Sequence, residues 1–199
     1  MNLPVCFYLS LFNMDIKSQN VIDYHGDNAI FMVWNFKNDI DVKDTFGRIC
    51  NLVINLNNSA DARFPDSGAS CVMGIGYDAW LRLHLPVPLP KELENFVPIV
   101  GKKHTAVCSK GDLHFHLRGD SSMCYDMAHT VSDGLKPVAI STEEIHGFRY
   151  WDGHSILGFV DGTEKSLMNR NGYSLVWLGM MILFIKEEVI FLFKNIFMI

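Results

Sequence analysis

Four short runs of aromatic and β-branched residues are separated by segments of different periodicity, and this alternation restricts the chain to a mixed fold. Such residues pack well on a pleated, half-buried surface, so each run is typical of a β-strand. The runs are AIFMVWNF at 29–36, SCVMGIGY at 70–77, DLHFHLR at 112–118 and EIHGFRY at 144–150. We therefore expect four strands.

The segment after the first run predicts an amphipathic helix. Asp39 or Asp41 can cap it, because a carboxylate there accepts a free backbone N–H. Its apolar residues recur at helical spacing and give one buried face: Val42, Phe46, Ile49, Cys50, Val53 and Leu56. The polar stretch 55–68, with Pro65 and Gly68, is expected to break this helix.

A second helix is expected after the third run, with Asp120 as its cap. Its apolar face comprises Met123, Met127, Val131 and Leu135. Gly134 and Pro137 are expected to stop it. Between the second and third runs, DAWLRLHL indicates only a short helical turn, and prolines 86, 88 and 90 exclude regular structure in the linker that follows.

The resulting order is β-α-β-β-α-β, which predicts an α+β domain of the ferredoxin-like type. In that arrangement two helices cover one face of an antiparallel sheet. A length of 199 residues with 49% hydrophobic residues provides enough apolar side chains for one such core. The net charge of −5 gives no basic surplus for nucleic-acid binding.

The cysteine content and the two ends of the chain indicate the compartment in which the protein is expected. Five scattered cysteines without a CxxC pair favour a reducing compartment, and we expect a cytoplasmic protein. Residues 1–19 are an apolar extension without the basic start of a signal peptide. YSLVWLGMMILFI at 173–185 has 13 uncharged residues, fewer than the roughly 20 that span a bilayer as a helix. We expect an apolar helical tail over 167–199 and no membrane span.

Two patterns invite a chemical interpretation, and an ordinary structural role is favoured for each. GIG at 74–76 lacks the third glycine of a dinucleotide-binding loop, so a strand end is the better interpretation. His114 and His116 alternate and share one strand face, and His146 could approach them. A zinc site needs further ligands that are not evident, so no metal is expected. The G-x-S-x-G turn of a serine hydrolase is absent from the sequence.

The segment GFVDGTE at 158–164 places a single acid, Asp161, between an apolar pair and Gly162-Thr163. Asp-Gly is a common turn dipeptide, so a plain turn explains the residues by themselves. Alternatively, the glycine lets the backbone approach a flat ligand, and the carboxylate acts as a general acid–base group. The residues alone leave both interpretations open.

EEIHGFRYWDGHSILGFVDGTE at 143–164 resembles the segment of the dye-decolorizing (DyP-type) haem peroxidases that carries their GxxDG motif, complete here as residues 158–162. The similarity continues through GDLHFHLRGD, VMGIGYDAW and AIFMVWNFKNDIDVKDTF, over roughly residues 20–166. The resemblance implies haem b, reduction of hydrogen peroxide and oxidation of dyes or phenolic compounds. It implies that Asp161 is the distal acid–base residue, with Phe159, Gly162, Thr163 and Glu164 next to the haem.

The chain departs from the family pattern after Glu164, where KSLMNRNGYSLVW replaces the expected Asn-Pro and the second domain. No histidine follows His154 that could act as the axial iron ligand. We therefore expect a truncated form: an extension at 1–19, a ferredoxin-like domain at 20–166, and a tail at 167–199. The expected partners are peroxide and an aromatic reductant. The alternatives are a non-catalytic ferredoxin-like module that binds a partner or forms homo-oligomers, and a membrane-associated fragment.

Overall fold

The computed structural model describes residues 19, 21, 26–91, 93–108, 110–151, 153, 154 and 156–158, together with the backbone of 184–185 and 188–189. The chain divides into two compact units, Met1–Gly147 and Phe148–Ile199. The first unit holds the main sheet and its helices. Within the described part of the chain, no helix is both long enough and apolar enough to cross a membrane.

The first unit is built on a four-stranded sheet, and each predicted strand run contributes one strand. The strands are β1 (Asn28–Phe36), β2 (Ser70–Ile75), β5 (Leu113–Gly119) and β6 (Ala139–Phe148). Their order in the sheet is β2-β5-β1-β6, and β5 runs antiparallel to both β1 and β2. The last strand begins five residues before the predicted 144, so it is the longest of the four.

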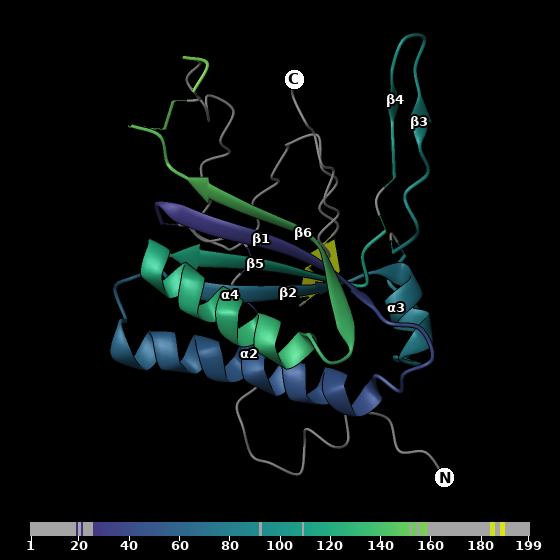
Figure 1. Ribbon diagram of the computed structural model, residues 1–199, viewed down its shortest axis with the longest axis horizontal. Coiled ribbons are helices and arrows are strands. Elements are labelled where there is room, and N and C mark those ends of the chain that lie inside the picture. Colours follow the sequence, from purple (N-terminus) through teal and green to yellow (C-terminus); the bar gives the residue numbers. More distant parts are fainter. Residues whose placement is uncertain are drawn as a thin grey trace. The chain divides into compact units, whose positions relative to one another are not determined.

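Two helices, α2 (Lys43–Arg63) and α4 (Ser121–Leu135), lie side by side on one face of this sheet (Figure 1). Side chains alternate between the faces of a strand, so every second residue points toward the helices. On β1 and β5 these are buried apolar residues: Ile30, Met32, Trp34, Phe36, Leu113, Phe115 and Leu117. They pack with Ile49 and Val53 of α2 and with Met127, Val131 and Leu135 of α4 to form the core.

The predicted start of α2 is confirmed, but its predicted end is wrong. The N-cap residue is Val42, which has no side-chain cap, and the Asp41 carboxylate one residue before it accepts the Lys43 backbone N–H at 3.0 Å. The helix then continues through the polar stretch to Arg63. Residues 55–63 contain neither glycine nor proline, and Pro65 disfavours helical backbone only at the residue before it, Phe64.

Asn57 explains why this polar part of α2 is held against the sheet. Its side-chain amide donates to the Cys71 carbonyl at 2.8 Å, and its oxygen accepts the Cys71 N–H at 2.8 Å. Gln19 makes the same pair of hydrogen bonds with Met73, at 3.0 and 2.7 Å. Because β2 is an edge strand, these amides satisfy backbone groups that would otherwise be unpaired.

Helix α4 begins as predicted, with Asp120 at the N-cap position, although its side chain makes no capping hydrogen bond. The role predicted for Gly134 is wrong, because this glycine lies inside the helix, which ends at Leu135. A Cβ at Gly134 would lie 2.9 Å from Ile49 Cδ1, so the glycine allows α2 and α4 to approach closely. Pro137 follows the helix, as expected.

The long connection from β2 to β5 carries more structure than the sequence indicates. It contains the predicted short helix α3 (Tyr77–Arg82) and an unpredicted hairpin of β3 (Ile99–Val100) and β4 (Thr105–Ala106). In the second unit, the described tail residues form a strand pair, β7 (Phe184–Ile185) and β8 (Glu188–Val189), where a helix was expected. The rest of the tail lies outside the described residues.

Candidate functional site

The five residues that the resemblance assigns to the haem site, Asp161 and its neighbours Phe159, Gly162, Thr163 and Glu164, lie outside the described residues. Their roles therefore stay predictions. The structure does describe Gly158, the first residue of the GxxDG motif. Gly158 has a φ of +88°, a backbone conformation that residues with a Cβ rarely adopt, so the motif begins with a turn that requires glycine.

The segment leading to the motif exposes several apolar side chains. Trp151 is 80% exposed and lies edge-on to Tyr150, with ring centroids 6.3 Å apart. The Gly153 N–H closes a turn by donating to the Tyr150 carbonyl at 3.0 Å. Ile156 and Leu157 are also exposed, the latter by 78%. The described residues that lead to the motif in the sequence therefore expose apolar surface to the solvent.

His114 and His116 share the sheet face opposite to the helices, as their alternation predicts. The His116 ring stacks on Phe31 of β1, with centroids 4.4 Å apart and an interplanar angle of 17°. The His114 ring lies 6.4 Å from the same Phe31 ring. Burial lowers the pKa of His114 from 6.5 to about 4, because a charged imidazole would lose its hydration there.

The predicted approach of His146 to these histidines is wrong, because β1 lies between β5 and β6 in the sheet. His146 instead contacts Glu144 of its own strand, at 2.7 Å from Nε2 to Oε1. Across the described ranges, no three His, Cys, Asp or Glu side chains gather into a group that could hold a metal ion. The histidine pair therefore packs against an aromatic ring.

The GIG segment has a packing role, in agreement with the structural interpretation. Gly76 directly precedes α3, and its N–H donates to the Asp112 carbonyl at 2.9 Å. A Cβ on Gly76 would collide with the carbonyl oxygen of Gly111. The glycine is therefore required where the end of β2 passes the start of β5.

The buried cysteines also have packing roles. Cys50, Cys71, Cys108 and Cys124 are free thiols. Burial raises the pKa of Cys71 to about 12 and the pKa of Cys50 and Cys124 to about 11. Because the thiolate is the reactive form, these three side chains are poor nucleophiles at neutral pH.

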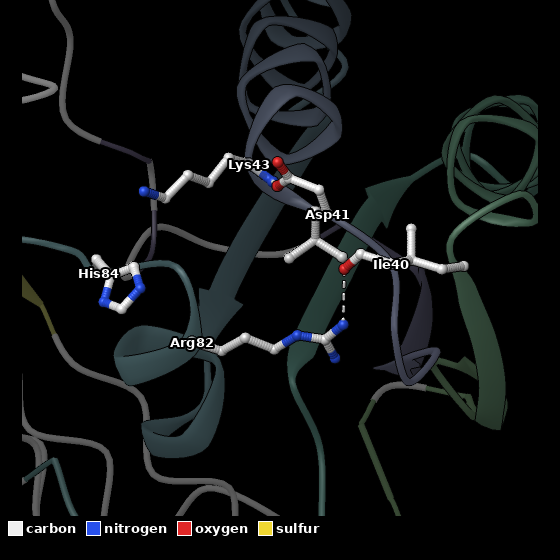
Figure 2. A pocket seen from close by; sticks show the side chains of 6 residues that line it. Ile40, Asp41, Lys43, Arg82 and His84 are labelled. Carbon is white, nitrogen blue, oxygen red and sulfur yellow. Dashed lines mark hydrogen bonds between the residues drawn. The ribbon is translucent and has the colours of Figure 1, made fainter.

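Sequence reasoning missed a pocket of about 310 Å³ between the start of α2 and the end of α3 (Figure 2). Residues 40–43 line one side, and Arg82 and His84 line the other. Arg82 Nη2 donates to the carbonyls of Lys37 and Ile40, at 2.7 and 3.0 Å. No contiguous motif could indicate this pocket, because its two sides are about forty residues apart in the sequence.

Comparison with known proteins places this fold in a family. The family description "Dyp-type peroxidase, N-terminal" matches residues 18–149. A dye-decolorizing peroxidase of Mycobacterium tuberculosis is 38% identical over 140 residues, which cover 69% of this chain and 40% of the relative. The chain thus spans less than half of that relative's length.

Solved structures agree with this match. A dye-decolorizing peroxidase from Bacteroides thetaiotaomicron superposes with a TM-score of 0.73 at 40% identity, covering 83% of this chain and 52% of that one. A variant of DypB from Rhodococcus jostii, solved in complex with heme, gives a TM-score of 0.64 at 30% identity, with 76% and 48% coverage. The chain belongs to the dye-decolorizing peroxidase family, and its residues 18–149 are the family's N-terminal region.

Proposed function

We propose that this chain provides the N-terminal domain and the distal acid–base residue of a haem-dependent peroxidase, which reduces hydrogen peroxide and oxidises a dye or phenolic compound. One observation carries the proposal: the N-terminal match at 18–149 is followed, after residues 150–157, by a complete GxxDG motif at 158–162. The family assignment makes it much less plausible that Asp161 belongs to a chance turn.

Asp161 is the catalytic residue in this proposal. Its carboxylate takes the proton from the peroxide oxygen that binds and gives it to the oxygen that leaves as water. An unperturbed aspartate has a pKa near 3.9 and a histidine one near 6.5, so an aspartate remains usable as a base in mildly acidic solution. Positioned proton transfer of this kind contributes about 10²–10⁴-fold to the rate.

Haem b is the proposed cofactor, and it would supply the iron at which peroxide is reduced. The described approach to the motif fits a flat apolar group. Gly158 has a positive φ, and Trp151, Ile156 and Leu157, which precede it in the sequence, are exposed apolar residues. We propose that Phe159, Gly162, Thr163 and Glu164 contact the haem on the side of Asp161.

We further propose that the ferredoxin-like domain extends over residues 20–166, beyond the boundary of the first compact unit at Gly147. The support is the order of its long elements along the chain, β1-α2-β2-β5-α4-β6, with both helices on one face of the antiparallel sheet. The free cysteines of the described part are compatible with the proposed cytoplasmic location, where thiols stay reduced.

The test has two arms. In the first, the chain is titrated with haem, and any saturable Soret absorption band is compared with that of the second arm, since the chain has no histidine after His154 to act as the axial ligand. In the second, residues 1–166 are joined to the part of the Mycobacterium tuberculosis relative that lies beyond the match. We expect this chimera to bleach an anthraquinone dye in a peroxide-dependent manner. Failure of haem to bind in both arms would contradict the proposal.

The alternative, a non-catalytic binding or oligomerisation module, is favoured by the β3–β4 hairpin. Val100 of β3 is 78% exposed, and Val97 and Val107 on the flanks of the hairpin are 74% and 77% exposed. A two-stranded ribbon with so much apolar surface has little stability in water without a partner. Concentration-dependent association in sedimentation velocity, with no haem bound, would support this alternative over the peroxidase.

A further inference from the structure

The pocket between α2 and α3 collects basic side chains from two distant parts of the chain. Lys43 is the first residue of α2, and Arg82 and His84 lie at the end of α3. Figure 2 shows the Lys43 side chain extending toward His84, whereas the Arg82 guanidinium points away from these two groups toward the Ile40 carbonyl. This arrangement is independent of Asp161 and of the proposed peroxidase activity.

Hydrogen-bond donors remain available in this pocket. The Arg82 guanidinium uses Nη2 for two backbone carbonyls, which holds the group in place. Within the described residues, its Nε and Nη1, the Lys43 amine and the His84 ring have no protein acceptor. The Asp41 carboxylate binds the Lys43 backbone N–H rather than any of these side chains. The charged side chains that line the pocket are Lys43, Arg82 and Asp41, so their formal charges sum to +1.

Lys43 occupies a position that helix electrostatics disfavours. The N-terminus of a helix carries partial positive charge, so acids stabilise it and a lysine is repelled. An anion bound beside Lys43 would remove that repulsion. Lys43 therefore destabilises the start of α2, and a bound anion would offset this destabilisation.

His84 also occupies a position that local backbone energetics disfavours. It has a φ of +52°, and α3 ends there with a pair of hydrogen bonds, His84 N–H to Leu81 O at 3.1 Å and Leu85 N–H to Trp80 O at 3.2 Å. This C-terminal motif usually has glycine at the left-handed position. Residues in locally unfavourable positions are expected mainly at functional sites. Lys43 at the helix N-terminus and His84 at a positive φ are two such residues, and both line this pocket.

We propose that this pocket binds a small oxyanion, namely a carboxylate or phosphate group, at the Lys43 amine and the His84 ring, with the Arg82 guanidinium contributing positive charge to the pocket. Oxygen acceptors suit the hydrogen-bond donors of both side chains. The pocket is open and its lysine and histidine are exposed, so we expect dissociation constants on the order of 1–10 mM for inorganic anions.

The test is a titration of the isotope-labelled full chain with sodium phosphate and, separately, with sodium acetate, at constant ionic strength set by sodium chloride. We expect saturable changes in the amide chemical shifts of Lys43, Asp44 and His84 with at least one anion. Saturation with phosphate alone, with acetate alone or with both identifies the class of oxyanion. No saturable change with either anion overturns the proposal.

Variants establish whether the pocket is responsible. Lys43→Glu reverses the charge while improving the electrostatics of the helix start, so it is expected to fold and to weaken binding by about tenfold or more. His84→Gln is expected to weaken binding by about threefold. Lys43→Gln removes the charge alone and is also expected to weaken binding. Lys103→Gln, at the tip of the β3–β4 hairpin, is its matched control and should leave binding unchanged. Equal weakening by Lys43→Gln and Lys103→Gln would show unspecific charge attraction and overturn the proposal.

Discussion

The buried imidazole of His114 makes the stability of the domain depend on pH in a defined window. The folded protein holds the pKa of His114 at about 4, against 6.5 for an unhindered histidine, because burial removes the hydration of the charged form. Between these two values the unfolded chain binds a proton that the folded chain does not. The free energy of unfolding therefore has its full value, with respect to His114, above about pH 6.5, and it falls as the pH decreases toward 4.

The size of this effect follows from the pKa difference. Each pKa unit corresponds to 1.36 kcal/mol, so a shift from 6.5 to about 4 corresponds to a loss of about 3 kcal/mol. Urea unfolding at pH 7.5 and at pH 4.5 measures it. Carboxylates titrate in the same window, so the relevant quantity is the difference between wild type and His114→Asn, which cannot be protonated.

We expect His114→Asn to lose about 2–3 kcal/mol less stability than wild type between these two pH values. His104→Asn, an exposed histidine next to the β3–β4 turn, is the matched control and should behave as wild type. Equal pH dependence of His114→Asn and wild type would refute the reasoning, because it would mean that His114 is protonated without cost in the folded state.

Two further substitutions test the account of the fold. Asn57→Ala removes the partners of both Cys71 backbone groups on the edge strand, and we expect a loss of about 2–3 kcal/mol in urea unfolding; a loss under about 0.5 kcal/mol would show that water replaces the amide. His84→Gly relieves the left-handed backbone at the end of α3, and we expect a gain of about 1 kcal/mol, or about 3 °C in melting temperature. His84→Ala keeps the strain and should give no gain.

The strands and the helical faces could be predicted because their signals are local. Period-two burial on β1 and β5 and helical periodicity on α4 depend only on neighbouring residues. The length of α2 could not be predicted, because Asn57 is held by an edge strand that lies distant in the sequence. Gly134 was misassigned for a similar reason, since its contact with Ile49 arises only when the helices pack.

Some features of the candidate site could likewise be predicted from the sequence, and others depend on tertiary structure. The GxxDG motif is visible in the sequence because its five residues are contiguous. His114 and His116 could be placed together from their alternation, but the position of β1 between β5 and β6 could not be read from the chain. The pocket of Lys43, Arg82 and His84 has no sequence signature, because tertiary structure alone brings its two sides together.

In the proposed function, Asp161 moves protons between the oxygens of hydrogen peroxide. The most direct measurement is kcat/KM for peroxide-dependent dye oxidation by the haem-loaded chimera, compared between wild type and Asp161→Asn. Asp66→Asn, in an exposed turn, is the matched control. We predict a fall of about 10²–10⁴-fold for Asp161→Asn with haem absorbance retained, and none for Asp66→Asn. Unchanged kcat/KM in Asp161→Asn would contradict the claim.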